Sequence, residues 1–308
     1  MLWERRPGAN RGEKLPRPAH APHLHPCRRR RSHSKSYCHD RVNWCLPAIS
    51  GGTWVTLMKN IHEAGLSLLQ KLGSEVHVWL ATPEAITDPE RLAYYAAILS
   101  PQERARHQRF HFEKDRHSFL VSHALVRKVL STYVDVAPAD WQFSAGRHGR
   151  PEIAGPAGVP ALRFNLTHTA GLTGCLVTLE ADGGIDAELL TRRGNLQAIA
   201  EKMFADAELV ALNKLDGRAF LEQFFIFWTL REAYCKALGV GIGFSKRDYA
   251  FEAGSDDRVR IRFDSQAGAS DWDWQFTILR PGADHLVAVA VRSDGLSGRE
   301  VIHRFIVP

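Results

Sequence analysis

The sequence predicts an α+β fold built from two similar α/β lobes in one chain, with an active site at their interface. Stretches of alternating hydrophobicity, typical of strands, are interspersed with stretches of helical periodicity. The order of strand, short helices, long helix and further strands then occurs a second time, about 110 residues later. The turn sequence at 181–184 marks the junction. We therefore expect one lobe over residues 58–183 and another over 184–308, with a cleft between them.

The composition is that of a soluble globular protein. The chain has 308 residues, of which 44% are hydrophobic and 24% are charged. No apolar run approaches the ~20 residues of a membrane span. The net charge of +6 is unevenly distributed, because residues 1–57 carry 11 Lys/Arg and three acids, whereas the rest carries 29 Lys/Arg and 31 acids. The body is close to neutral, so we expect neither a nucleic acid nor a membrane as a partner.

Residues 1–57 are rich in Pro, Arg and His and lack hydrophobic periodicity. We expect this segment to be disordered or a non-native upstream extension, with Met58 as the biological start, because regular patterns begin just after it. Its three cysteines lie near histidines, but their spacing matches no familiar zinc-binding pair. Cys175 and Cys235 are the cysteines of the body, a usage typical of a reducing compartment, which predicts a cytoplasmic protein.

In the first lobe, residues 75–81 alternate and predict a strand, and residues 89–99 predict a helix. Ser100, Pro101 and Glu103 form the start signal of another helix, because the serine caps it, the proline suits its first turn and the acid completes a capping box. The other elements expected here are a long helix near 115–133, a loop at 146–160, and strands at 164–166 and 172–179.

The second lobe is expected to repeat this order. Its elements are a strand at 185–188, helices at 196–203, 206–215 and 220–238, and strands at 249–252, 259–263, 272–279 and 285–291.

Three acids of the second lobe stand where a metal ion would bind. Asp186 and Glu188 are two residues apart on the expected strand, so both side chains point to one face. Glu232 lies in the expected long helix, with Lys236 one turn further on the same face. Carboxylates beside cations suit a magnesium ion that bridges to phosphate oxygens. Spacing alone does not distinguish such a site from a solvated strand face and an ordinary helical ion pair.

Five segments resemble motifs of the 4'-phosphopantetheinyl transferase superfamily. Residues 184–188 (GIDAE) resemble its G-[IV]-D-x-E motif, and residues 227–239 (FWTLREAYCKALG) resemble its F-W-[TCS]-x-[KR]-E-[AS]-x-x-K-x-x-G motif. Residues 164–169 (FNLTHT), 149–151 (GRP) and 100–130 are similar to three further family segments, in the family's order. The likeness covers about residues 75–295. The two-lobed length resembles the larger, pseudodimeric kind of transferase, to which the surfactin-synthetase activator belongs.

The resemblance implies transfer of the 4'-phosphopantetheine group from coenzyme A to a serine of an apo acyl- or peptidyl-carrier protein, which leaves adenosine 3',5'-bisphosphate. Asp186, Glu188 and Glu232 would hold Mg²⁺. Glu232 would also take the proton from the serine, and Lys236 would neutralise the leaving phosphate. A monomer is expected. The residues that would contact coenzyme A are Arg106, His117, Arg150, Thr167 and His168.

Two departures and two alternatives bear on this interpretation. Thr167 stands where the family usually has serine, and Glu103 stands where some relatives carry a lysine toward the 3'-phosphate. A magnesium-dependent phosphodiesterase or nuclease would use the same acids, but we find no second ligand set in the sequence. A binding module would use the Arg-rich tail as a nucleic-acid arm, which the near-neutral body argues against. The sequence does not identify the carrier protein or its pathway.

Overall fold

The computed structural model describes residues 65, 67–146, 149–191, 194–240, 248–253, 259–263, 273–293 and 298–308. The N-terminal segment 1–57 and the expected start at Met58 lie outside these described residues. Within the described ranges, no helix combines the length and the hydrophobicity that crossing a bilayer requires.

The first half closely follows the sequence prediction. The strands at 75–81 and 172–179 begin and end where predicted, and Ser100 caps α3 through the predicted capping box. The expected loop at 146–160 is wrong, because residues 151–155 form a strand of a hairpin. The elements are β1 (Glu75–Ala81), η1 (Pro83–Ala85), α2 (Pro89–Ile98), α3 (Pro101–His107), α4 (Glu113–Leu130), η2 (Pro138–Asp140), β2 (Gln142–Ala145), β3 (Pro151–Gly155), β4 (Leu162–Thr169) and β5 (Leu172–Leu179).

The second half repeats this succession and adds a last strand that the sequence did not predict. Its long helix begins at Gly217, three residues before the predicted start. The elements are β6 (Gly183–Leu189), α5 (Leu196–Met203), α6 (Asp206–Leu212), α7 (Gly217–Leu238), β7 (Tyr249–Ala253), β8 (Val259–Phe263), β9 (Trp274–Leu279), β10 (His285–Arg292) and β11 (Glu300–Phe305). The fold is therefore mixed α+β, as predicted.

Two sheets share the same internal strand order. The first sheet has the order β11-β1-β5-β4, and the second has the order β6-β10-β9. In the first sheet, β1 pairs antiparallel with β5, and β5 pairs antiparallel with β4. In the second sheet, β6 pairs antiparallel with β10, and β10 pairs antiparallel with β9. Each half also has a separate two-stranded hairpin, β2–β3 or β7–β8. β11 departs from the pattern, because it returns to the first sheet and pairs parallel with β1.

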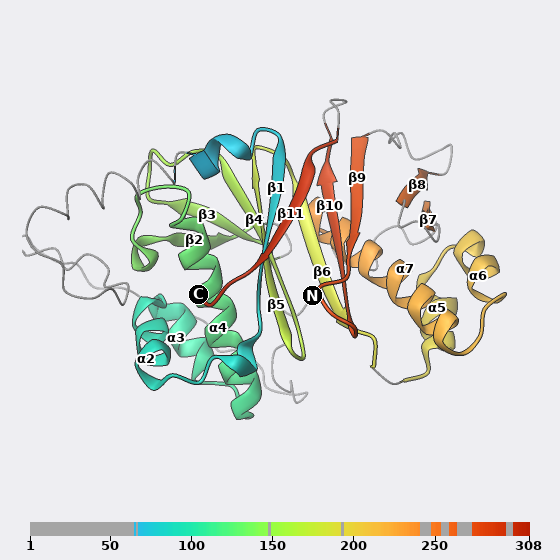
Figure 1. Ribbon diagram of the computed structural model, residues 1–308, viewed down its shortest axis with the longest axis horizontal. Helices are drawn as coiled ribbons and strands as arrows, with labels where there is room; N and C mark the ends of the chain where they lie inside the picture. Colours follow the sequence, from blue (N-terminus) through green and yellow to red (C-terminus); the bar gives the residue numbers. More distant parts are fainter. Residues whose placement is uncertain are drawn as a thin grey trace, which may run out of the picture.

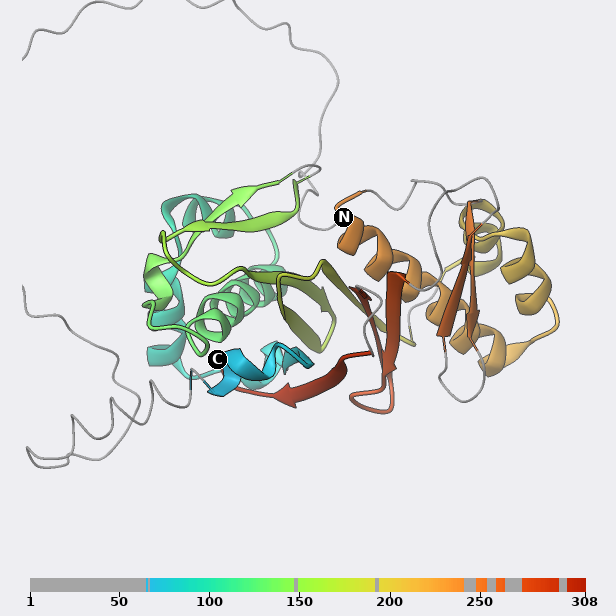
Figure 2. The same ribbon diagram turned by 90° about the horizontal axis from the view of Figure 1, so that it is seen from above.

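The molecule has four layers: helices, first sheet, second sheet and helices (Figures 1 and 2). α4 packs on β4 and β5, whereas α7 packs on β6 and β10. Alternate residues of β1 serve two of the spaces between the layers. Val78 lies in the apolar cluster between the sheets, whereas Trp79 lies in the cluster beneath α4. The strand alternation seen in the sequence therefore reflects burial on both faces of each sheet.

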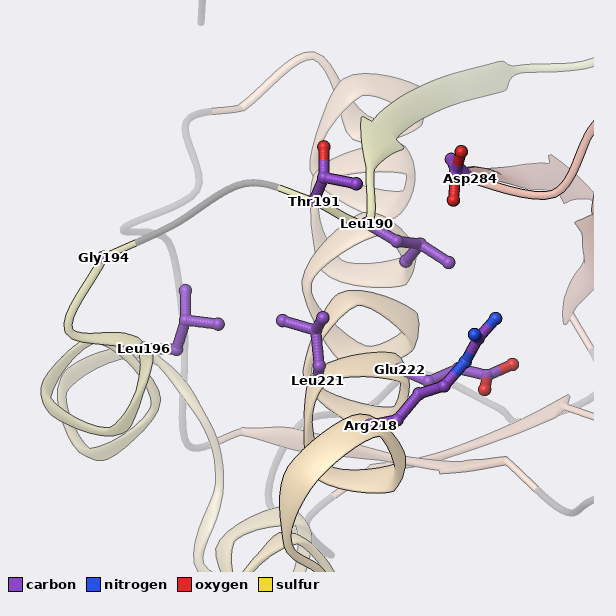
Figure 3. Close-up of a pocket in the computed structure, with 8 residues that line it drawn as sticks. All are labelled: Leu190, Thr191, Gly194, Leu196, Arg218, Leu221, Glu222 and Asp284. Atoms are coloured by element: carbon purple, nitrogen blue, oxygen red, sulfur yellow. The ribbon is translucent and has the colours of Figure 1, made fainter.

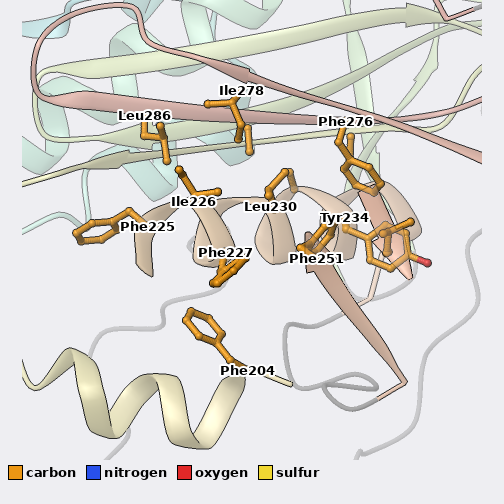
Figure 4. Packing of buried hydrophobic residues seen from close by; sticks show 14 of the residues in the cluster. Phe204, Phe225, Ile226, Phe227, Leu230, Tyr234, Phe251, Phe276, Ile278 and Leu286 are labelled. Carbon is orange, nitrogen blue, oxygen red and sulfur yellow. The ribbon is translucent and has the colours of Figure 1, made fainter. Parts of the chain in front are cut away.

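The apolar cluster beneath α7 anchors the helix that carries Glu232. Figure 4 shows Ile226 and Leu230 of α7 against Ile278 and Leu286 of the second sheet. Phe227, which is 2% exposed, belongs to the same cluster, so it is a core residue. Burial of this whole face fixes the rotation of α7 about its axis and therefore the direction of its polar side chains.

Each half contains a glutamate that binds an arginine of its long helix. Glu103 accepts hydrogen bonds from Arg127 Nη2 at 2.6 Å and Nε at 3.1 Å. Glu208 on α6 accepts hydrogen bonds from Arg231 Nη2 at 2.6 Å and Nε at 2.9 Å. The two pairs occupy corresponding places, because each joins a short helix to the long helix that follows it. Glu103 therefore has a structural role, because it joins α3 to α4 in the first half.

We expect acid to weaken the fold through Glu103. Burial alone would raise the pKa of Glu103, but hydrogen bonds from His123 and the Ser100 backbone, with the charge of Arg127, lower it from 4.5 to about 2. Because the folded-state pKa is the lower one, this stabilisation is complete above about pH 4.5 and is lost as the pH falls toward 2. The shift corresponds to about 3 kcal/mol of unfolding free energy. Urea unfolding across this window should show a flatter acid limb for Glu103→Gln, and identical limbs would contradict the expectation.

Candidate active site

β6 and α7 approach each other closely at Gly184. A Cβ atom at this position would lie 2.0 Å from the Ala233 carbonyl oxygen and 2.5 Å from the Ala237 backbone nitrogen. The absence of a side chain therefore lets the helix rest directly on the strand. In the first half, His77 corresponds to Gly184. His77 pairs with Val177, the sixth residue of β5, and Gly184 pairs with Ala290, the sixth residue of β10. The close approach is thus a feature of the second half.

Asp186 and Glu188 lie on the face of β6 that meets α7. Lys236 Nζ donates to Asp186 Oδ1 at 2.8 Å and to the Ile185 carbonyl oxygen at 2.9 Å. The exposed fractions are 11% for the Asp186 side chain and 20% for that of Lys236. Trp228 Nε1 donates to Glu188 Oε1 at 3.1 Å. Both acids therefore contact the same helix, which confirms the prediction from their i, i+2 spacing.

Glu232 lies on α7 one turn before Lys236, on the same side of the helix, and is partly buried. In the part of the chain that the structure describes, no three His, Cys, Asp or Glu side chains lie close enough together to hold a metal ion. The carboxylate oxygens of Asp186, Glu188 and Glu232 are nevertheless the donors that magnesium prefers, and they come from two elements in direct contact. The chemistry of the donor set fits Mg²⁺, although Asp186 and Glu188 are bound by protein groups here.

The predicted coenzyme residues of 164–169 lie on β4. Thr167 is 3% exposed, and its Oγ1 accepts a hydrogen bond from the Ala187 backbone N–H at 3.0 Å. His168 points to the opposite face of the strand and is exposed at part of its surface. The pKa of His168 is lowered to about 4, because neighbouring atoms displace water from the ring and because the Lys236 ammonium lies nearby. The ring is therefore neutral at pH 7, and the structure separates it from the Thr167 hydroxyl.

Arg150 lies in a cavity of about 270 Å³ where the first half meets the second. Its Nη1 donates to the Ala237 carbonyl oxygen at 2.7 Å, and its Nη2 donates to that of Gly183 at 3.2 Å. Within the described residues, Arg150 Nε is a buried side-chain nitrogen that has no hydrogen-bond partner. Arg163 lines the same cavity and forms an ion pair with Asp182 at 2.7 Å. Glu152 and Asp182 line the cavity as well, so the two guanidinium groups are offset by two carboxylates, and the unused Arg150 N–H is the group that suits an anionic ligand.

Arg106 and His117 lie in the first half, on α3 and α4. His117 Nε2 lies 2.7 Å from the Pro83 carbonyl oxygen, so its ring is held by η1. His123 is buried, which lowers its pKa, although its hydrogen bond with Glu103 acts in the opposite direction. Sequence reasoning assigned no role to His123, although a histidine on the apolar face of a predicted helix was the available signal.

A larger cavity of about 530 Å³ begins just beyond the end of β6. In Figure 3, Leu221 of α7 points toward Leu196 of α5, while Arg218 and Glu222 lie on the other side of α7. Its leucines make part of the wall apolar, whereas the smaller cavity at Arg150 is lined by two arginines and two acids, Glu152 and Asp182. The smaller cavity therefore has the more polar wall.

Among its described residues, the first half has no equivalent of the acid set. Trp79 stands in β1 where Asp186 stands in β6, because each pairs with the fourth residue of its partner strand. Lys128 on α4 corresponds to Glu232 on α7. Lys128 directly follows Arg127, which binds Glu103, and Glu232 directly follows Arg231, which binds Glu208. The duplicated architecture therefore carries carboxylates at these positions in one half.

Comparison with known proteins agrees with the motifs. The sequence model of the 4'-phosphopantetheinyl transferase superfamily matches residues 183–290, and the model of the 4'-phosphopantetheinyl transferase N-terminal region matches residues 87–179. The 4'-phosphopantetheinyl transferase HetI of Nostoc sp. is 34% identical over 177 residues, which cover 56% of this chain and 73% of that protein. The 4'-phosphopantetheinyl transferase Sfp of Bacillus subtilis is 26% identical over 184 residues, which cover 60% of this chain and 78% of that protein.

A holo-(acyl-carrier-protein) synthase from Bacillus anthracis, solved in complex with CoA (3',5'-ADP), matches 36% of this chain and 94% of its own, with 19% identity and a TM-score of 0.28. That structural score is low, so the family assignment rests on the sequence relatives. The two sequence models fall one in each half of the molecule. The chain therefore belongs to the 4'-phosphopantetheinyl transferase superfamily. It is accordingly an enzyme of the 4'-phosphopantetheinyl transferase class.

Proposed function

We propose that this enzyme transfers the 4'-phosphopantetheine group of coenzyme A to a serine of an apo acyl- or peptidyl-carrier protein, with Mg²⁺ at the acids of β6 and α7. The observation that carries the proposal is the contact between Lys236 Nζ and Asp186 Oδ1 at 2.8 Å, made by the same strand and helix that carry Glu188 and Glu232. It brings a cation and carboxylates together, as transfer between a diphosphate and a hydroxyl requires. Membership of the superfamily supports the same general reaction.

Asp186, Glu188 and Glu232 would hold the magnesium ion together with the coenzyme A diphosphate. When bound, magnesium neutralises charge on the phosphate oxygens and orients them. In the free protein, Lys236 keeps the mostly buried Asp186 carboxylate paired, which avoids the cost of an isolated buried charge. Lys236 is therefore already at the site where negative charge arrives with the coenzyme.

The proposed reaction exchanges one P–O bond for another. The serine oxygen bonds to the phosphorus that carries pantetheine, and the bond from that phosphorus to 3',5'-ADP breaks. Glu232 would accept the serine proton, directly or through water. Lys236 would neutralise the phosphate oxygen that leaves with 3',5'-ADP, and would be placed to protonate it.

Coenzyme A would be held by groups of the first half. Arg150 supports this assignment because its buried Nε is an unused donor in a cavity that Arg163, Glu152 and Asp182 also line. His168 would bind as a neutral donor near Lys236. Arg106 and His117 would approach the 3'-phosphate. Thr167, the fifth residue expected at coenzyme A, has its hydroxyl oxygen occupied by the Ala187 N–H.

We also propose that the chain is a pseudodimer with lobes at 58–183 and 184–308 and its active site at their interface. The repeated strand order and the two glutamate–arginine pairs support this division. β4 of the first half lies against β6 of the second, which supports an interfacial site. We further propose, from the charge and the cysteine usage of the sequence, a monomeric, cytoplasmic enzyme without a nucleic-acid or membrane partner. Sedimentation equilibrium would test the monomer, and a concentration-dependent dimer would contradict it.

The function is tested by weighing carrier proteins. Purified enzyme is incubated with coenzyme A, Mg²⁺ and a panel of apo acyl- and peptidyl-carriers, and each carrier is then examined by mass spectrometry. We expect one 4'-phosphopantetheine group on at least one carrier, on its serine, and none when EDTA removes the metal. A carrier with that serine replaced by alanine is the control. No added mass on any carrier of a broad panel would contradict the proposed function.

A further inference from the structure

β6 is bound along its open side by side chains of the other half. Within the described residues, β6 pairs with β10 alone, and β4 is the end strand of the first sheet. The Ile185 N–H donates to Asn165 Oδ1 at 3.0 Å, and the Ala187 N–H donates to Thr167 Oγ1 at 3.0 Å. Both acceptors lie on β4. The edge of the second sheet is thus joined to β4 by side chains that take the place of a strand's carbonyl groups.

The two acceptors match the two donors in spacing. Asn165 and Thr167 are two residues apart and therefore point to the same face of β4. Two residues of a strand span about 6.6 Å, which is also the separation expected between the N–H groups of Ile185 and Ala187. Asn165 and Thr167 are 4% and 3% exposed, so water does not compete for these hydrogen bonds. The seam therefore fixes the register of β6 against β4.

Asp186 is the residue between the two bound N–H groups. Its Oδ1 lies 3.5 Å from Thr167 Oγ1, and Lys236 binds both this oxygen and the carbonyl oxygen of Ile185. Because Thr167 Oγ1 already accepts the Ala187 N–H, its own proton is available to the Asp186 carboxylate. The strand on both sides of Asp186, and the carboxylate itself, are therefore held from the first half.

We propose that Asn165 and Thr167 are positioning residues for the metal site, and that through them the acids of the second half depend on the first half. In this proposal Thr167 acts through Asp186 and not on the coenzyme phosphates. The inference rests on the proposed function, because it takes Asp186 as a metal ligand. Groups that orient a metal ligand typically change metal affinity or activity by about 10- to 100-fold when they are removed.

Binding of Mn²⁺ as a magnesium substitute tests this on the full chain with coenzyme A saturating, by the electron paramagnetic resonance of free Mn²⁺. Thr167→Val removes the hydroxyl at nearly constant shape, and Asn165→Leu removes the amide acceptor. We expect each to raise the Kd for Mn²⁺ by about 10-fold or more, whereas Thr167→Ser, which keeps the hydroxyl, changes it by less than about twofold. The two independent variants keep the test decisive should one of them fold poorly.

Thr178→Val is the matched control. Thr178 is 1% exposed, and its hydroxyl donates to the Ala181 carbonyl oxygen at 2.7 Å, so the variant also loses a buried hydrogen bond. It should lower Tm without changing the Kd for Mn²⁺. Wild-type affinity in folded Thr167→Val and Asn165→Leu would overturn the positioning role while leaving the metal site intact. Failure of the wild-type chain to bind Mn²⁺ would instead overturn the metal site of the proposed function, and this inference with it.

Discussion

Glu232→Gln is expected to lower kcat/KM for carrier modification by about 10³-fold or more, because the variant loses both a metal ligand and the acceptor of the serine proton. Glutamine keeps the size and helix preference of glutamate, so Tm should change by less than about 2 °C. The rate is measured from the mass of the carrier at saturating coenzyme A and magnesium. Near wild-type activity of this variant would refute the assignment of Glu232.

Glu252→Gln provides the control for this substitution. Glu252 lies on β7, where it pairs with Arg262 at 2.7 Å, and half of its side chain is exposed. Its activity should equal that of the wild-type enzyme. Asp186→Asn is less clean, because Asp186 forms a mostly buried ion pair with Lys236 and its loss will also cost stability.

Gly184→Ala is expected to destabilise the fold by about 3 kcal/mol, which corresponds to roughly 6–12 °C in Tm. The added methyl group would lie 2.0 Å from the Ala233 carbonyl oxygen and 2.5 Å from the Ala237 nitrogen, and both are backbone atoms that no rotamer change can move. α7 must therefore shift away from β6, which takes Glu232 and Lys236 away from Asp186. Transfer activity should fall in step, even at temperatures where the variant is folded.

Gly282→Ala is the control for the methyl group itself. A Cβ atom at Gly282 has no heavy atom within 4 Å in the described structure. This variant should stay within about 0.5 kcal/mol of the wild-type stability and keep full activity. Calorimetry and the carrier assay on both variants would check the pair, and a Gly184→Ala enzyme with unchanged Tm would contradict the close approach of β6 and α7.

Local sequence signals determined most of the helices and strands. β1, β5 and α5 begin and end at the predicted residues, because their apolar periodicity runs their whole length. The helix α7 begins three residues early, since its first turn is polar and carries no apolar period. β3 was predicted as loop because Pro151 and Gly155 bound it, yet proline and glycine are tolerated in a short hairpin strand. β11 was missed because its partner β1 lies more than 200 residues away, and no local pattern encodes such a pairing.

The candidate site was only partly predictable. The i, i+2 spacing of Asp186 and Glu188 correctly predicts that both side chains point to one face of their strand, where both contact α7. The role of Gly184 depends on how near α7 comes, which the sequence does not specify. The bonds of Asn165 and Thr167 to β6 depend on the packing of two sheets, so spacing along the chain did not predict them. The roles of Arg106, His117, Arg150 and His168 remain predictions.

The return of β11 determines how this molecule can be taken apart. The chain leaves the first sheet after β5, builds the second half and comes back beside β1, where the Ile306 N–H donates to the Leu80 carbonyl oxygen at 2.8 Å. Arg91 of α2 binds the carbonyl oxygen of Pro308 at 3.3 Å. A cut at the junction of the two repeats would strip β1 of its parallel neighbour and expose an edge that invites pairing between chains. The halves are repeats by architecture but not separable modules, and any split version of the enzyme has to carry its last strand with its first half.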